Sequence, residues 1–310
     1  MNPIGLAIAA EPSAHPAPPG HPERYERLAA AIAALDTPQL KAITQPLKAR
    51  EYDPALLSPI HSRAYITQLA TAVPPGEQHD ADTFQSAGSF EASCRMTWAL
   101  LSAVDAAFGE GPVTSFILGR PPGHHACRER PMGFCLVNHV AVAARYALDS
   151  HHAGRVAIVD FDVHHGNGTQ ELFYDRSQVL YISSHQYPFY PGTGGRDETG
   201  TAEGDGYTVN FPLPAGTDDR TFLEIYEHEV ARSLKQYRPD LILVSAGFDA
   251  HIADPLGGLS ITGGGFKRVG EILKSLADEV CDGRLISILE GGYDAEANKE
   301  SVCNYIEGLA

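Results

Sequence analysis

The 310-residue sequence has no run of basic residues, and its 23 Lys and Arg are outnumbered by 39 Asp and Glu, giving a net charge of −16. A protein that binds the phosphate backbone of a nucleic acid needs a basic patch, so direct nucleic-acid binding is not expected. An acidic surface favours the approach of a cationic substrate, such as a lysine-rich segment or a polyamine. The same charge is equally typical of an ordinary cytosolic protein.

Cysteines and long apolar segments are also scarce. No apolar stretch approaches the ~20 residues of a membrane span. Residues 1–10 lack a basic start and make a poor signal peptide. We therefore expect a soluble, cytoplasmic protein with no membrane partner. The cysteines are too few and too widely spaced for a disulfide framework, which fits a reducing compartment; they are Cys94, Cys127, Cys135, Cys281 and Cys303.

Repeats and linker-like breaks are absent, so residues 1–310 are expected to form one domain. Apolar, strand-like segments instead alternate with amphipathic, helix-like ones. After a first strand near the N-terminus, strands are predicted at 114–118, 156–162, 179–183, 241–245 and 285–289. Helices are predicted up to Leu35 and at 90–108, 138–148, 221–237 and 265–280, with loops at 13–20 and 73–88. This alternation predicts an α/β fold with a mostly parallel central sheet and helices on both faces.

Potential metal ligands follow one of these strands. Alternate residues of a strand project to one face, so Asp160, Asp162 and His164 are expected to project together while Phe161 and Val163 point the other way. The acids could simply cap neighbouring loops. Buried together, however, they would cost several kcal/mol unless a cation or hydrogen-bond donors compensated them.

Reactive side chains follow other strands as well, and the carboxyl ends of parallel strands meet at one edge of a sheet. A catalytic zinc site usually has three protein ligands, which Asp162, His164 and Asp249 would provide. Fe(II), Co(II) and Mn(II) accept the same donors. Asp249 alone is also consistent with a helix cap. Asp160 is better suited to orient a histidine or to help hold another cation.

The doublet His124-His125 lies on a loop after a predicted strand and could be a surface feature or a pair of proton carriers. A histidine paired with the carboxylate of Asp160 would be more cationic, whereas one paired with the neutral Asn167 would remain a base. Tyr293, which follows two glycines, could donate its hydroxyl to an oxyanion, or it could be a core tyrosine.

Eight motifs of the chain together resemble the histone deacetylase-type zinc amidohydrolases, a family that includes acetylpolyamine amidohydrolases and bacterial acetoin-utilisation proteins. They run in order through nearly the whole sequence, which makes coincidence a poor explanation. The motifs occupy residues 21–27, 120–126, 133–138, 160–169, 190–194, 246–250, 254–258 and 289–293.

This resemblance implies the arginase–deacetylase fold and a metal-activated water, with His125 as general base, His124 as its electrostatic partner and Tyr293 polarising the acyl carbonyl. Asp160 and Asn167 would be the partners of the two histidines. The implied zinc ligands are Asp162, His164 and Asp249. The implied substrate-binding positions are Gly133, Phe134, Tyr190, Leu256, Gly291 and Gly292. One implied potassium site uses Asp160, Asp162, His164, Ser183 and Ser184, and a second uses Phe173, Arg176, Val179 and Tyr207.

Single positions indicate which branch of this family the chain resembles. Asn167 resembles the class II deacetylases, because class I members usually carry aspartate there. Tyr293 replaces the histidine of the weakly active class IIa group, so catalysis is expected. Leu256 stands where polyamine-selective class IIb relatives carry a glutamate. Bacterial polyamine enzymes use other acids in a long loop, a part that Glu77, Asp80 and Asp82 could play here.

We therefore expect a zinc-dependent hydrolase that removes an acetyl or related acyl group from the ε-amine of lysine in proteins or peptides, with potassium as a structural ion. The first alternative is an acetylpolyamine amidohydrolase, and a longer-chain deacylase is another. A non-catalytic acyl-lysine binding module would not need every acid–base position to be filled. An arginase-like manganese enzyme would need more clustered acids. The oligomeric state is left open.

Overall fold

A computed structural model describes residues 3–71, 77–151 and 153–310. Its centre is an eight-stranded sheet with the order β2-β1-β5-β10-β9-β6-β7-β8, in which every neighbouring pair is parallel. The parallel α/β architecture predicted from the sequence is thus confirmed. The strands are β1 (Ile4–Ala9), β2 (Thr44–Pro46), β5 (Thr114–Gly119), β6 (Val156–Asp160), β7 (Val179–Gln186), β8 (Thr208–Leu213), β9 (Leu241–Ala246) and β10 (Leu285–Leu289).

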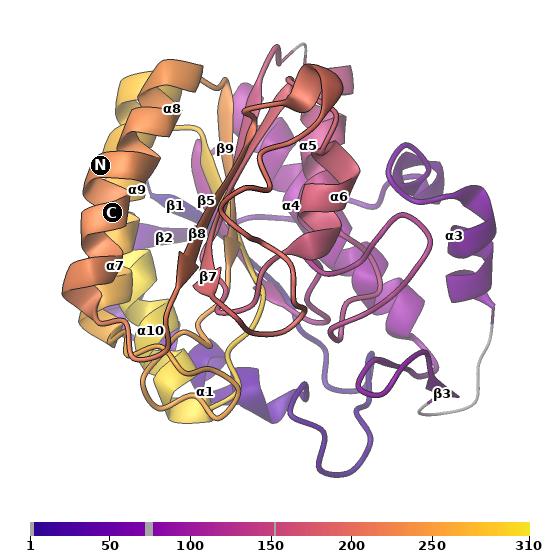
Figure 1. Cartoon of the computed structure of the whole chain (residues 1–310). Coiled ribbons are helices and arrows are strands. Elements are labelled where there is room, and N and C mark those ends of the chain that lie inside the picture. Colours follow the sequence, from indigo (N-terminus) through magenta and orange to yellow (C-terminus); the bar gives the residue numbers. More distant parts are fainter. Residues whose placement is uncertain (1–2, 72–76, 152) are drawn as a thin grey trace.

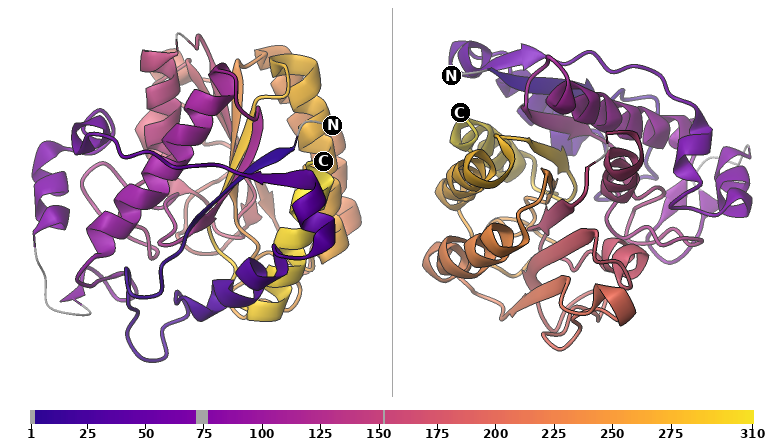
Figure 2. Two further views of the ribbon diagram at one scale, coloured as in Figure 1. Left: turned by 180° about the vertical axis from the view of Figure 1, so that it is seen from behind. Right: turned by 90° about the horizontal axis from the view of Figure 1, so that it is seen from above.

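Helices cover both faces of this sheet (Figures 1 and 2). One face carries α1 (Glu26–Ala34), α7 (Asp219–Ile225), α8 (Ala231–Tyr237), α9 (Gly263–Cys281) and α10 (Ala295–Gly308), and the other carries α4 (Ser89–Phe108), α5 (His139–Ser150) and α6 (Asn167–Phe173). The remaining helical segments are α2 (Pro38–Ile43), α3 (Arg63–Ala70), η1 (Pro54–Leu57), η2 (Ala202–Gly204) and the π-helical η3 (Tyr226–Val230). Because both faces are covered, strands β5, β6, β7, β9 and β10 are buried along their whole length.

Several predicted boundaries differ from the structure. The strand predicted at 156–162 ends at Asp160, so Asp162 and His164 lie on bends beyond it. The helix predicted at 221–237 contains the π-helical turn η3 between α7 and α8. Within the loop predicted at 73–88, residues 73–76 lie outside the described residues. The rest forms a hairpin of β3 (Glu77–Gln78) and β4 (Phe84–Gln85), whose residues 83–86 are buried rather than on the surface.

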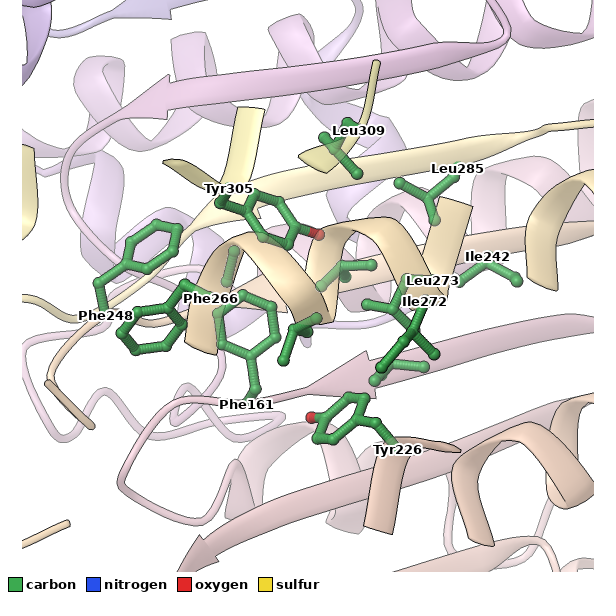
Figure 3. Close-up of a cluster of buried hydrophobic side chains, with 14 of the residues drawn as sticks. Phe161, Tyr226, Ile242, Phe248, Phe266, Ile272, Leu273, Leu285, Tyr305 and Leu309 are labelled. Carbon is green, nitrogen blue, oxygen red and sulfur yellow. The ribbon is translucent and has the colours of Figure 1, made fainter. Parts of the chain in front are cut away.

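Aromatic rings pack under the segment that follows β6 (Figure 3). Phe161 lies with its ring centroid 5.6 Å from that of Phe248, 5.9 Å from Phe266 and 5.4 Å from Tyr305. Phe161 and Val163 are both fully buried and belong to the same apolar core cluster as Phe248, Phe266 and Tyr305. Burying a phenylalanine stabilises the fold by roughly 2–3 kcal/mol, so this packing holds the polar residues of the segment in place.

The strand order brings four chain segments to one edge. Strands β9 and β10 enter the sheet between β5 and β6, so β5, β10, β9 and β6 are neighbours. In the register, Asp160 of β6 is aligned with Ser245 of β9 on one side and with Ser183 of β7 on the other. The segments that leave the carboxyl ends of these strands therefore meet where α/β proteins bind their ligands.

All five cysteines lie within the described residues, and each is free. None of the helices in the described ranges has the length and apolar character that a membrane span requires.

Candidate metal centre and substrate pocket

Three side chains from two strand ends converge on one point. Ligand atoms of Asp162, His164 and Asp249 all lie within 4.8 Å of one another. His164 Nδ1 is 3.0 Å from Asp162 Oδ1 and 3.2 Å from Asp249 Oδ2. The other oxygens of the two aspartates accept backbone N–H groups, Asp162 Oδ2 from Gly291 at 2.8 Å and Asp249 Oδ1 from Val163 at 2.9 Å. These bonds aim one oxygen of each aspartate at the imidazole.

The chemistry of this triad fits a divalent cation. Asp249 Oδ2 is buried and accepts no hydrogen bond from the described residues. Burial alone would lower the pKa of His164, but the two aspartates raise it to about 10. A cation that binds here would displace this proton, as metals do from their ligands. Gly247 and Gly291 leave the necessary room, because a Cβ at either position would collide with an aspartate oxygen of the triad.

His124 lies against a carboxylate. Its Nδ1 is 3.0 Å from Asp160 Oδ2, which also accepts the hydroxyl of Tyr181 at 3.0 Å. Both the histidine and the aspartate are buried. Burial lowers the pKa of His124, but the charges of Asp160 and Asp162 outweigh burial and raise this pKa to about 10. His124 is therefore an imidazolium at neutral pH.

His125 lies against an amide. Its Nδ1 is 2.8 Å from Oδ1 of Asn167, the first residue of α6. Burial and the neighbouring His124 and His164 hold the pKa of His125 well below its usual range. An amide oxygen only accepts hydrogen bonds, so Nδ1 carries the proton and Nε2 is left as an acceptor. The ring centroids of the two histidines are 4.0 Å apart, yet their surroundings shift the two pKa values in opposite directions.

An apolar pocket of about 260 Å³ opens above the triad. The rings of Phe134 and Tyr293 meet edge to face at 5.6 Å, and that of Tyr190 meets His125 edge to face at 5.3 Å. Burial raises the pKa of Tyr293 well above its usual value, so its hydroxyl stays a donor. The pocket is lined by Asp82, His125, Gly133, Phe134, His164, Phe189, Tyr190, Leu256 and Tyr293.

The turn that carries Phe134 is strained. Gly133 and Phe134 both have positive φ, +55° and +68°, and the second value is unusual for a bulky residue. A Cβ on Gly133 would collide with the His125 ring. The backbone N–H of Phe134 donates to Thr83 Oγ1 at 3.1 Å, so the hairpin of residues 77–85 supports the pocket wall.

The predicted potassium residues are distributed as follows. Ser183 is the cross-strand neighbour of Asp160, and its hydroxyl contacts His185 Nδ1 at 2.8 Å. The Ser184 hydroxyl contacts the Tyr226 hydroxyl at 2.8 Å. For the second site, Phe173, Arg176 and Val179 border one surface depression, whereas Tyr207 borders a different one. The predicted Gly291 lies beside the triad and Gly292 lies beside Asn298 and Phe248, and neither glycine is among the residues that line the pocket.

Two buried acids beside the site were not assigned a role from the sequence. Glu290 accepts the backbone N–H groups of Gly123 at 2.6 Å and His124 at 3.2 Å and the hydroxyl of Ser245 at 3.0 Å. Asp254 Oδ2 accepts the backbone N–H of Tyr293 at 2.6 Å. Their position in the motifs at 254–258 and 289–293 was a usable signal, but their partners come from other segments and are not visible in the sequence.

Fold and site together define an α/β protein with a candidate metal centre and an apolar pocket at the carboxyl edge of a parallel sheet. Comparison with known proteins specifies the class further. Residues 21–309 match the histone deacetylase domain. The chain is 39% identical over 302 residues to "Histone deacetylase 10, chloroplastic" of Oryza sativa subsp. japonica, covering 92% of this chain and 68% of the relative.

Two further likenesses agree. The chain is 36% identical over 297 residues to a "Probable deacetylase" of Archaeoglobus fulgidus, covering 94% of this chain and 82% of the relative. The crystal structure of the HDA15 HD domain superposes with a TM-score of 0.89 at 36% identity, covering 99% of this chain and 89% of the other. The chain belongs to the histone deacetylase family, whose members are zinc-dependent amidohydrolases, and it is a deacetylase.

Proposed function

We propose that this chain, as one catalytic domain of residues 1–310, hydrolyses the amide between an acetyl or related acyl group and the ε-amine of lysine in proteins or peptides. The observation that carries the proposal is the pocket, which has aromatic walls at Phe134 and Tyr190 and ends at His164 of the triad. An apolar wall suits the four-carbon stem of lysine, which buries its methylenes while the amide reaches the floor.

The proposed chemistry uses the residues at the pocket floor. A zinc ion held by Asp162, His164 and Asp249 would supply Lewis-acid activation of the acyl carbonyl and of water; Fe(II) or Co(II) would suit the same donors. His125 takes the proton from the attacking water through Nε2 and returns it to the leaving amine. The Tyr293 hydroxyl donates a hydrogen bond to the oxyanion, and the imidazolium of His124 stabilises the negative charge that develops nearby.

Potassium is proposed as a structural ion. Asp160, Asp162 and His164, together with Ser183 and the backbone at Ser184, would form the site nearer to the zinc. This set is supported by the register that places Ser183 beside Asp160. Phe173, Arg176, Val179 and Tyr207 would form the more distant site through backbone oxygens. A potassium titration monitored by thermal unfolding tests both sites. Ser183→Ala is expected to weaken potassium binding only at the site nearer to the zinc.

A second candidate function is deacetylation of an acetylated polyamine. It is favoured by Asp82, which lines the pocket and could pair with the distal ammonium of such a substrate. Glu77 lies on the same hairpin but is exposed and does not line the pocket. Leu256, in contrast, adds an apolar group where a further carboxylate would strengthen polyamine binding.

The two functions are separated by kcat/KM for an acetyl-lysine peptide and for N-acetylputrescine or acetylspermidine under equal conditions. We expect the zinc-loaded protein to prefer the peptide, and a clear preference for a polyamine would overturn this choice of substrate. In that case Asp82→Asn should weaken polyamine turnover, whereas the charge-matched control Glu77→Gln should not. Tyr293→Phe should reduce kcat on either substrate about 10²–10³-fold, because it removes an oxyanion donor.

A further inference from the structure

Two sulfur atoms lie behind the Asn167 side chain, on the side away from His125. Asn167 Nδ2 is 3.3 Å from Met132 Sδ and 3.5 Å from Cys127 Sγ. Cys127 is buried, and Met132 and Asn167 are half-buried. Both sulfurs belong to the loop between β5 and α5, whereas Asn167 begins α6, so this contact joins two segments that are distant in the sequence.

Met132 Sδ can only accept a hydrogen bond from the amide, and Cys127 Sγ can accept one while its own proton has other acceptors. A thioether has no proton to give, so Met132 presents lone pairs alone. The thiol of Cys127 has one proton, and it is directed to the backbone oxygen of His125 at 3.6 Å or to Met132 Sδ at 4.0 Å. Arg130 Nη2 also approaches Cys127 Sγ as a donor, at 3.8 Å. The sulfur atoms are therefore matched to the NH₂ end of the Asn167 amide and not to its oxygen.

The orientation of this amide decides which nitrogen of His125 carries the proton. With Nδ2 against the sulfurs, Oδ1 faces His125 Nδ1, at 2.8 Å, and requires a proton there. A flipped amide would present Nδ2 to His125 Nδ1, which would then have to accept. The proton would move to Nε2, and a protonated Nε2 cannot take a proton from water.

We propose that Cys127 and Met132 are positioning residues, whose sulfur atoms orient the Asn167 amide and thereby keep Nε2 of His125 unprotonated. The inference rests on the general-base role proposed above for His125. The two sulfur atoms would then contribute more than packing. Groups that hydrogen-bond to the partner of a functional histidine commonly set the tautomer of that histidine.

A matched pair of variants at one position tests this. Met132→Leu keeps the size and removes the acceptor, whereas Met132→Gln offers an oxygen acceptor instead. In zinc-loaded protein, Met132→Leu combined with Cys127→Ala should lower kcat about fivefold, because two weak hydrogen bonds no longer oppose the flip, with KM unchanged. Met132→Gln in the Cys127→Ala background should recover part of that loss, because its oxygen can accept from Asn167 Nδ2 although its own NH₂ group can also bind Asn167 Oδ1. Thermal unfolding checks that each variant is folded.

A double-mutant cycle separates orientation from packing. The carboxylate in Asn167→Asp has two equivalent oxygens and cannot be flipped into a donor. In that background the loss of both sulfurs should change kcat less than about twofold, so the two effects should be non-additive by a factor of about 2.5 or more. An equal loss with and without the Asn167→Asp substitution, or no loss in either background, would overturn the inference.

Nitrogen NMR of ¹⁵N-histidine-labelled, zinc-loaded protein reads the tautomer directly. The His125 signals, assigned with His125→Ala, should show a protonated Nδ1 in the wild type and a second tautomer when both sulfurs are removed. An unchanged tautomer would overturn the inference. Full activity of His125→Ala would instead overturn the general-base role, so failure of the inference and failure of the proposed function give different results.

Discussion

His124 and His125 are adjacent in the chain but lie against two different regions of the molecule. We call Asp160 and Glu290, which bind the His124 side chain and backbone, the carboxylate side. The amide–sulfur side, behind His125, consists of Asn167, Cys127 and Met132. One side provides negative charge to an imidazolium, and the other provides only neutral groups to a neutral imidazole. The surroundings, rather than the residue type, shift the pKa values of the two histidines in opposite directions.

Removing His125 should have the largest effect on turnover. His125→Ala should lower kcat about 10³-fold, within the range expected for loss of a general base. Zinc content should be unchanged, because His125 is not in the triad of metal ligands. Steady-state kinetics and metal analysis of the purified variant measure both quantities. Activity within about tenfold of the wild type would mean that His125 is not the base.

Removing one of the two carboxylates from the carboxylate side should have the next largest effect. Asp160→Asn removes the charge that holds His124 as an imidazolium, so we expect kcat to fall about 30-fold, equivalent to about 2 kcal/mol of transition-state stabilisation. Asp149→Asn removes an equal charge from a surface ion pair with Arg145 and serves as the control. Equal rates in the two variants would show that the charge at Asp160 does not matter for turnover.

A smaller effect is expected when only the hydrogen bonds from Glu290 to the backbone of Gly123 and His124 are weakened. Glu290→Gln keeps one acceptor oxygen for the N–H groups of Gly123 and His124 but replaces the other oxygen with a donor. We expect kcat to fall about fivefold, the value of roughly one hydrogen bond. Ser245→Ala removes only the hydroxyl that donates to Glu290 and should cost less. The reverse order would place the important contact at Ser245.

The smallest effect concerns stability and leaves turnover at neutral pH unchanged. His61 supports the amide–sulfur side, with Nδ1 at 3.0 Å from the Cys127 oxygen and Nε2 accepting the Asn138 N–H at 3.0 Å. Burial lowers the pKa of His61 from 6.5 to about 4. Below pH 6.5 the unfolded chain takes up a proton that the folded protein does not, so the stabilisation present above pH 6.5 is lost as pH falls towards 4.

Urea unfolding at about pH 7.5 and about pH 5 measures this dependence. His61→Gln cannot titrate, so the wild type should lose about 2 kcal/mol more than the variant between the two pH values. Parallel curves for the two proteins would mean that His61 is not held neutral in the folded state.

Much of the fold could be predicted because its core strands are continuous apolar segments. Strands β5, β6, β9 and β10 and helices α4 and α9 lie where the sequence predicts them. Strand β8 was missed because its Asn210 and Pro212 are weak strand formers. Pairing with β7 stabilises β8 as a strand despite these residues. Helix α10 was missed because polar Asn298 and Ser301 are buried on its inner face, which obscures the apolar period.

The side chains at the strand ends can be read from local sequence, because a polar residue directly after an apolar segment marks the end of a strand. The strand order, in contrast, depends on tertiary packing: β9 and β10 lie between β5 and β6, which brings Asp249 to His164 and Glu290 to His124. Likewise, only packing showed that the sulfurs of Cys127 and Met132 lie behind Asn167. Such contacts join segments distant in sequence, and burial and strand order, rather than local preference, select them.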